Sequence, residues 1–281
     1  MKEKRVFSVW VRRILKLVGI VLLCMVLFFV NALFGNPLSA ALARFSAQWY
    51  VAQEYGHLDV QIERVGYNFK SGNYYAHVSS PTSQDTYFTV DISMLGKVER
   101  DTYENVTDGF NTWGRLNEEY RVLVKETVSG LDWPYEMDII SGDLMGSGYD
   151  CGWIEDYELP WSELVLDGEY DILELGRKHG GLHIRVYDED VSYLRGAEIL
   201  SDIAARLKEK DLPFYAVDFM LSRPRCEEQP YEDVTLWLLD FPAADIGGTD
   251  FEQKVREGHE RTMAYFEEEN LLKLEEEKLL K

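Results

Sequence analysis

The histidines and one glycine-flanked serine are the residues of this sequence whose types and spacing could do chemistry, yet none completes a catalytic pattern. His259 and Glu260 begin the H-E-x-x-H pattern of zinc proteases, but Met263 occupies the place of the second histidine. Ser147 lacks a G-x-S-x-G elbow because Met145 stands where the first glycine belongs. No dinucleotide-binding or P-loop glycine pattern occurs. We therefore predict no catalytic residue, no metal site and no cofactor.

A cysteine nucleophile is the main catalytic alternative. Cys151 could react if His179 or His183 served as its base, because a thiolate must form at neutral pH. No local motif supports that pairing, and in a chain with 50 acidic residues a pair of carboxylates is uninformative. We favour a non-catalytic binding or interaction protein of the cell envelope. An envelope hydrolase using carboxylates or Cys151 is one alternative, and a structural or regulatory partner of another membrane protein is a second.

A binding surface is predicted on two alternating segments, "YYAHVSS" and "TYFTVDIS". Their alternation is typical of half-buried strands, with six side chains facing a core: Tyr74, Ala76, Val78, Phe88, Val90 and Ile92. The opposite parity leaves four candidates for ligand binding: Tyr75, His77, Tyr87 and Thr89. In the loop between the strands, Asp85 and Thr86 are expected to hold the turn by bonding the backbone.

An apolar run near the N-terminus predicts a membrane anchor. Residues 17–34 carry no charge, and six cations precede them. This is enough helix to cross a hydrocarbon core, and the positive-inside rule places the N-terminus in the cytoplasm and the body outside the cell membrane. We expect a cytoplasmic tail over residues 1–13 and an anchor over 14–35. A cleaved signal peptide is the alternative, because the triplet Ala41-Leu42-Ala43 resembles a cleavage site.

The charge and the cysteines narrow the possible partners. A net charge of −21 repels phosphate backbones, and no basic stretch lies beyond the N-terminal tail, so we exclude nucleic acid as a partner. The membrane is the partner that the sequence predicts, and a protein or envelope ligand stays unknown. Outside the anchor only Cys151 and Cys226 remain, and they could form a disulfide or stay two separate thiols.

We predict an α+β protein in which two small domains follow the anchor. The first, over residues 36–130, reads α-β-β-β-β-α: a helix that begins at Asn36 and Pro37, four strands with a β-bulge near Glu63-Arg64, and a helix over "FNTWGRLNEEYRVLVKETV". An antiparallel meander with helices against one face would be a complete domain.

The second domain, over residues 131–281, reads β-α-β-β-α after a short leading strand and helix. "FYAVDFML" and "DVTLWLLDF" are apolar on both parities, which predicts central strands covered on both faces. Residues 131–167 hold ten acidic residues, six aromatic ones and no Lys or Arg. They could bind an ion or a cationic partner, or form a solvated acidic face over packed aromatics. In "YDEDVS" the calcium-loop pattern is absent, so we expect those acids to serve a helix N-terminus.

Several of these segments together resemble one family. They are the span with "GNPLSAALA", "YNFKSGNYYAHVSSPTSQDTYFTV", "FNTWGRLNEEYR", "YDED" and "PFYAVDF". The chain resembles the YfjL-like, membrane-anchored proteins of Gram-positive bacteria over nearly its whole length. The resemblance implies a single N-terminal anchor and two α/β extracytoplasmic domains, and it implies no activity. Tyr87 stands where the family often carries a histidine, so no metal or acid/base role is transferred to that position.

Overall fold

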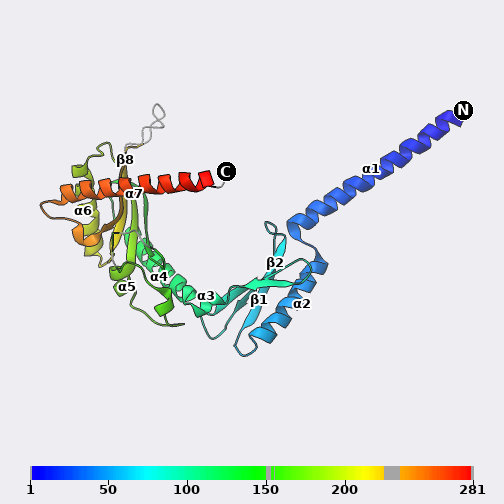
Figure 1. Cartoon of the computed structure of the whole chain (residues 1–281), viewed down its shortest axis with the longest axis horizontal. Helices are drawn as coiled ribbons and strands as arrows, with labels where there is room; N and C mark the ends of the chain where they lie inside the picture. Colours follow the sequence, from blue (N-terminus) through cyan, green and yellow to red (C-terminus); the bar gives the residue numbers. More distant parts are fainter. Residues whose placement is uncertain (1, 150–152, 155, 225–234, 280–281) are drawn as a thin grey trace. The chain divides into compact units, whose positions relative to one another are not determined.

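The computed structural model describes residues 2–149, 153–154, 156–224 and 235–279. By contacts the chain divides into two compact units, Met1–Asn111 and Thr112–Lys281, and each is described by itself (Figure 1). A long apolar helix precedes two sheet-containing domains, so the predicted α+β class is confirmed. Cys151 and Cys226 lie outside the described residues, and with them the question of their disulfide.

The first unit begins with two helices that a single break separates. Helix α1 (Lys2–Phe34) is long and apolar enough to cross a membrane, a test that a signal sequence also passes. Gly35 has a φ of 70°, a left-handed conformation that glycine adopts without strain and that ends the helix. The Asn36 side chain accepts a hydrogen bond from Ser39 N (2.8 Å) and starts α2 (Pro37–Glu54). The predicted N-cap and the proline at the first helical position are confirmed.

The first sheet is an antiparallel meander in the order β1-β2-β3-β4. Its strands are β1 (Gln61–Asn68), β2 (Asn73–Ser79), β3 (Tyr87–Ile92) and β4 (Val98–Asp101), and a one-turn helix, α3 (Glu104–Thr107), follows them. Helix α2 packs Ala43, Ala47 and Val51 on one face of the sheet. All six side chains predicted to face a core are buried there. The register shifts between Ile62 and Arg64, which confirms the predicted bulge.

Helix α4 (Phe110–Ser129) packs in the second unit, whereas we expected it to complete the first. Its Leu116, Tyr120 and Val124 are fully buried in the core that also contains Leu182 and Val217. Helical spacing identified the buried face, but periodicity does not say which sheet receives that face. The units therefore divide at residue 111, and not at the expected boundary of residue 130.

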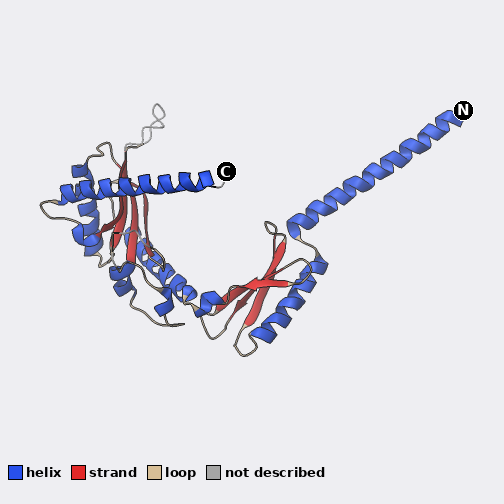
Figure 2. Ribbon diagram, viewed as in Figure 1, coloured by secondary structure: helices blue, strands red, loops and turns tan. Residues whose placement is uncertain are grey.

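The second sheet has the order β5-β6-β7-β8, and only β6 and β7 are parallel. The strands are β5 (Glu136–Leu144), β6 (Gly180–Tyr187), β7 (Ala216–Ser222) and β8 (Thr235–Pro242). The helices are η1 (Trp161–Glu163), α5 (Ile172–His179), α6 (Tyr193–Glu209), η2 (Ala243–Asp245) and α7 (Phe251–Leu279), drawn in blue in Figure 2. Helices α6 and α7 pack against each other, and α7 also packs along β8.

Strand β8 lies at the edge of this sheet, so its predicted central position is wrong. Leu236 and Leu238 are buried in the core, while Trp237 points the other way and is 38% exposed. The apolar residue Trp237 on the outward face of β8 is explained by a helix and not by a further strand. Its ring packs edge-on against Phe266 of α7, with ring centroids 6.0 Å apart. A contact with a helix can thus mimic the pattern of a doubly covered strand.

Three glycines make room for the ring of Tyr120. A Cβ at Gly176 would lie 2.5 Å from Tyr120 Cε2, one at Gly180 would lie 2.5 Å from the Tyr120 hydroxyl oxygen, and one at Gly142 would lie 3.1 Å from Cε1. The hydroxyl donates to Pro213 O (3.0 Å), and burial raises the pKa of Tyr120. The tyrosine therefore ties α4 to β5, α5 and β6 at one point.

We expect Gly176→Ala to destabilise the second unit by about 1–3 kcal/mol, because overpacking a close-packed site forces neighbouring groups to move. Urea denaturation followed by circular dichroism measures the change. Gly130→Ala is the matched control, since its nearest atom lies 3.6 Å from the added Cβ. Equal stability of the two variants would show that the groups around Tyr120 move to accept the added methyl group without a loss of stability.

Candidate functional site

The four predicted binding residues lie on the face of the first sheet opposite to α2. His77 pairs with Thr89, and its Nδ1 lies 3.2 Å from Thr89 Oγ1. The Tyr75 ring meets the His77 ring edge-on at 5.1 Å. Tyr87 pairs with Ser79 and is 47% exposed, and burial followed by the charge of Asp85 raises its pKa. The sheet thus gathers Tyr75, His77 and Thr89 by mutual contacts, with Tyr87 at the strand's beginning.

A more concave polar surface lies on the second sheet, on the face opposite to its helix-covered core. Two adjoining hollows of about 370 and 180 Å³ share the side chains of Arg185, Met220, Trp237 and Phe266. We call the two hollows together the outer groove. The side chains that line the outer groove come from β6, β7, β8 and the middle of α7. The groove therefore depends on the order of the strands and on where α7 crosses the sheet.

His183 forms one end of the outer groove, between two carboxylates. Its Nδ1 lies 2.9 Å from Asp218 Oδ2 on the parallel neighbour β7, and its Nε2 lies 3.5 Å from Asp143 Oδ2 on β5. These two bonds raise the pKa of His183 from its ordinary 6.5 to about 10, although burial acts in the opposite direction. The imidazole is therefore protonated at neutral pH, and the two carboxylates neutralise it.

The carboxylates around His183 are themselves held by further groups. Burial alone would raise the pKa of Asp143, but its bonds to His183, Asn117 and Arg121 lower it below its usual value. Arg121 Nε donates to Asp143 Oδ1 at 3.0 Å, and Asn117 Nδ2 donates to the same oxygen at 3.2 Å. The other oxygen of Asp218 accepts from the backbone nitrogen of Asp240 (2.7 Å). Helix α4 and strand β8 thus both position this end of the groove.

The larger hollow of the outer groove combines cations with apolar side chains. Ten described residues line it, among them Arg185, Arg223, His259 and Trp237, and none of the ten is acidic. Arg185 Nη1 donates to Asp138 Oδ2 at 3.2 Å, on the neighbouring strand β5. The apolar part is made by Trp237 with Phe266, Met220 and Met263. Such a lining suits a ligand that carries both a negative charge and an apolar group.

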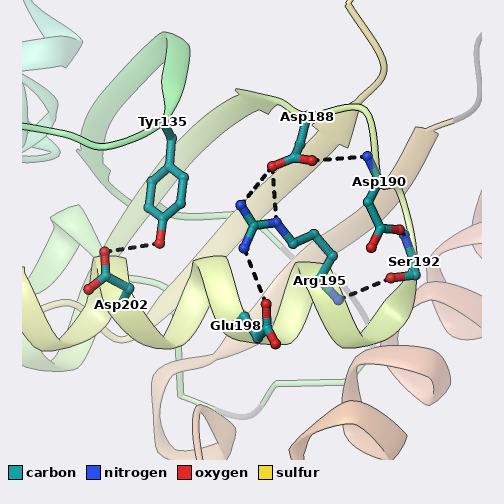
Figure 3. A network of polar contacts seen from close by, with 7 residues as sticks. All are labelled: Tyr135, Asp188, Asp190, Ser192, Arg195, Glu198 and Asp202. Carbon is teal, nitrogen blue, oxygen red and sulfur yellow. Dashed lines mark hydrogen bonds and ion pairs between the residues drawn. The ribbon is translucent and has the colours of Figure 1, made fainter.

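A second polar cluster, at the beginning of α6, holds the structure together. Arg195 donates to Asp188 Oδ2 through both Nε (3.0 Å) and Nη2 (2.8 Å), as Figure 3 shows. Asp188 also accepts from Asp190 N (2.9 Å), and Ser192 caps the helix by accepting from Arg195 N (3.2 Å). Two acidic residues of "YDEDVS" thus serve the beginning of α6, as the sequence predicted, because Asp188 bonds Arg195 in the first turn and Asp190 accepts from Ser192 N.

A larger hollow of about 850 Å³ lies at the other end of this unit, between α5, α6 and η2. Its floor is apolar, with Ala205, Leu212 and Phe214, and Arg177 and Lys208 lie in its lining. Convergent polar groups with perturbed pKa values distinguish ligand sites from surface hollows, so the outer groove is the stronger candidate.

The aromatic residues of the acidic segment pack, as the second of the two readings of residues 131–167 expects. Tyr157 is buried and stacks on Tyr215 at 5.3 Å, Trp161 meets Trp113 at 5.8 Å, and the Tyr135 hydroxyl donates to Asp202 (3.0 Å). The Tyr149 hydroxyl donates to the carboxylate of Asp240, and the backbone nitrogen of Asp240 donates to Asp218. Tyr157 packs against Gly181 and Ala216, on the same face of the sheet as His183 and Asp218, so this segment lies beside the outer groove.

The two histidines that could serve a cysteine nucleophile have pKa values shifted in opposite directions. A histidine whose pKa lies near 10 already holds its proton at neutral pH, so it cannot act there as a general base. Burial lowers the pKa of His179, whose Nδ1 lies 3.2 Å from Tyr157 O. Cys151, the proposed nucleophile, lies outside the described residues. Within the described part of the chain, no group of three or more His, Cys, Asp and Glu side chains could hold a metal ion.

The alternation in "LHIRVYD" predicts that His183 and Arg185 lie on one face of their strand, but it does not reveal their neighbours Asp143, Asp218 and Trp237. Each of these is the outward residue of another strand, and alternation alone could have marked it. Only the register, in which His183 stands opposite Asp218 and beside Ser141, brings the carboxylates to the ring. That register was not visible in the pattern.

Comparison with known proteins identifies the family. The model described as YfjL-like, N-terminal domain, matches residues 11–102, and the one described as YfjL-like C-terminal domain matches residues 119–256. No curated protein and no solved structure matches the chain. The first match covers most of the apolar helix and the meander. The second covers most of the second unit, from Glu119 in α4 to Arg256 in α7, and so includes the groove residues on β6, β7 and β8 but not those on α7. The chain therefore belongs to the YfjL-like family.

Proposed function

We propose that this protein is a membrane-anchored binding protein, with its N-terminus in the cytoplasm and its body outside, that holds a ligand in the outer groove. The six cations before the apolar helix and the acidic body after it support this orientation. A long apolar helix close to the N-terminus supports the anchor. A single-pass anchor of this kind keeps a binding domain at the cell surface.

The observation that carries the binding function is the charge of the groove lining. In a chain with 50 acidic residues against 29 basic ones, the described lining of the larger hollow has two arginines, one histidine and no acid. Trp237 lines the same hollow of about 370 Å³ as the two arginines, and its ring packs against Phe266. The ligand class that fits is a carboxylate or phosphate joined to an apolar or planar group.

The test uses capped aromatic amino acids, with N-acetyl-phenylalanine as the acid and its amide as the uncharged match. We expect the acid to bind more tightly than the amide, and Trp237→Ala or Arg223→Gln to weaken its binding about tenfold, a loss of about 1.4 kcal/mol. Isothermal titration calorimetry on the full chain in detergent measures both effects. Ala205→Trp, which fills the hollow beside α6, is the control and leaves the affinity unchanged.

Two outcomes would contradict the proposal. One is that acid and amide bind alike or not at all, and the other is that Ala205→Trp removes binding while Trp237→Ala does not. Turnover of an ester or peptide panel by the full chain would favour the hydrolase alternative instead. Cys151→Ser would then show whether that thiol is responsible.

A further inference from the structure

We infer that one end of the first domain inserts into the surface of the lipid bilayer. The orientation of this domain relative to the membrane is then restricted, and the domain does not rotate freely about its anchor. This end consists of the first turn of α2 and the two turns that join β1 to β2 and β3 to β4. We call it the seating end and define it by Leu38, Phe69, Lys70, Leu95 and Lys97. The inference rests on the proposed membrane anchor and is independent of the outer groove.

The three parts of the seating end are brought together by the register of the sheet. Asn68 pairs with Asn73, which closes the first turn, and Tyr74 pairs with Ile92. Ile92 pairs in turn with Val98, so the second turn lies at the same end of the sheet. This second turn also lies against α2, because a Cβ at Gly96 would be 2.5 Å from Leu42 Cγ.

Hydrogen bonds hold this end of the sheet directly at the end of the apolar helix. The Tyr67 hydroxyl donates to Ala32 O at 2.9 Å, inside the last turn of α1. The Tyr74 hydroxyl accepts from Asn36 N (3.1 Å) and donates to Asn36 O (3.0 Å). Where α1 leaves the membrane, the seating end must therefore lie within a few residues of the bilayer surface.

The seating end exposes large apolar side chains that the domain does not cover. Leu38 is 80% exposed, Phe69 is 60% exposed and Leu95 is 86% exposed. They come from three separate segments, and each is at or next to a turn. Single exposed apolar residues are ordinary, but a group of them at one end of a domain marks a surface that is covered in use.

The charge of the seating end indicates that the surface which covers these apolar side chains is a lipid bilayer. Residues 36–43, 67–74 and 93–98 contain Lys70 and Lys97 and no acidic residue, in a chain with 50 acids, and the adjoining Glu99 accepts a hydrogen bond from Asn73 (2.9 Å). At the opposite end of the same sheet, residues 53–61 and 79–87 contain Glu54, Asp59 and Asp85 and no Lys or Arg. Apolar side chains beside lysines are the composition with which proteins enter the interface of a membrane that contains anionic lipid.

The experiment places a fluorescent label at single cysteines of the full chain, in a background with Cys24, Cys151 and Cys226 replaced by serine. Leu95→Cys and Phe69→Cys report on the seating end, and Gln84→Cys in the exposed β2–β3 turn is the matched control at the far end. Val26→Cys, within α1, tests the anchor. The protein is reconstituted in vesicles of phosphatidylcholine and phosphatidylglycerol that contain lipids with a quencher near the headgroup, or, for the label at position 26, lipids with a quencher in the acyl chain.

We expect the quencher lipids to reduce the emission of labels at Leu95→Cys and Phe69→Cys severalfold more than at Gln84→Cys. Lys70→Glu together with Lys97→Glu should diminish that quenching, because anionic lipid then repels the seating end. Quenching at Val26→Cys without quenching at positions 69 and 95 overturns the inference and leaves the anchor intact, whereas no quenching at position 26 overturns the anchor itself. A label at position 95 that shifts to the blue without lipid quenching is covered by protein, which also overturns the inference.

Discussion

A fragment that begins at residue 131 is expected not to fold, although residue 131 is where the sequence pattern placed the start of the second domain. The fragment lacks Leu116, Tyr120 and Val124 of α4, which are fully buried in the second core. Burying each such side chain contributes about 1.5–3 kcal/mol, and the three together approach the whole stability of a typical domain, about 5–15 kcal/mol. Far-UV circular dichroism and the dispersion of amide signals in NMR spectra measure the difference.

The matched fragment is residues 110–281, which adds α4 and nothing else. We propose that this fragment is the complete second folding unit, and we expect it to unfold cooperatively in urea. The first hydrophobic core contains no residue of α4, and Asn111, which donates to Asp85 O and Tyr87 O, belongs to the first unit, so residues 36–111 should keep their fold without the rest of the helix. A cooperative transition in the fragment 131–281, at the midpoint of the longer one, would place the boundary at residue 130 after all.

The stability of the second unit is expected to fall as the pH rises from about 6.5 to about 10, because of His183. Its pKa in the folded state, about 10, exceeds its ordinary value of 6.5, so the folded chain keeps a proton that the unfolded chain releases in this window. The contribution is complete below pH 6.5 and is lost as the pH passes the folded pKa. His183 is 36% exposed in its side chain, and with that solvent screening we expect about 1–2 kcal/mol.

Asp143 acts at the opposite end of the pH scale. Its pKa is lowered below 3.8, so its contribution is present above that value and is lost as the pH falls through the folded pKa. The cluster should therefore be most stabilising between these two windows. Urea denaturation of residues 110–281 at a series of pH values measures both limbs.

Asp218→Asn should return the pKa of His183 toward its ordinary value, because the ring loses the charged partner of its 2.9 Å contact. A histidine titration by NMR reports this pKa directly, and the alkaline slope of stability should flatten in the same variant. Asp138→Asn is the control, since Asp138 bonds Arg185 and Tyr187 and not His183. A pKa of His183 that stays unchanged in Asp218→Asn would show that the contact is absent in solution.

The pattern of residues determined most of the local structure. Alternation in "YYAHVSS" and "TYFTVDIS" identified six buried side chains, and Asn36 with Pro37 marked the beginning of a helix, since these signals depend on neighbours a few residues away. The shift of parity at Glu63-Arg64 revealed a bulge for the same reason. The uncharged run over residues 17–34 predicted a helix able to span a membrane just as directly, because the length and composition of one helix decide whether it can do so.

The tertiary structure alone decided what depends on distant partners. Tyr120 could have packed on either sheet, and only the space left by Gly142, Gly176 and Gly180 shows that it belongs to the second. The outer groove forms because parallel pairing sets His183 beside Asp218 while α7 brings Phe266 to Trp237, and these residues lie 35 and 29 positions apart. Periodicity tells which face of an element is apolar, but it carries no information on which surface meets that face. For this chain, therefore, the sequence determined the elements, among them an apolar helix long enough to span a membrane, and the packing between elements decided the domain boundary and the candidate site.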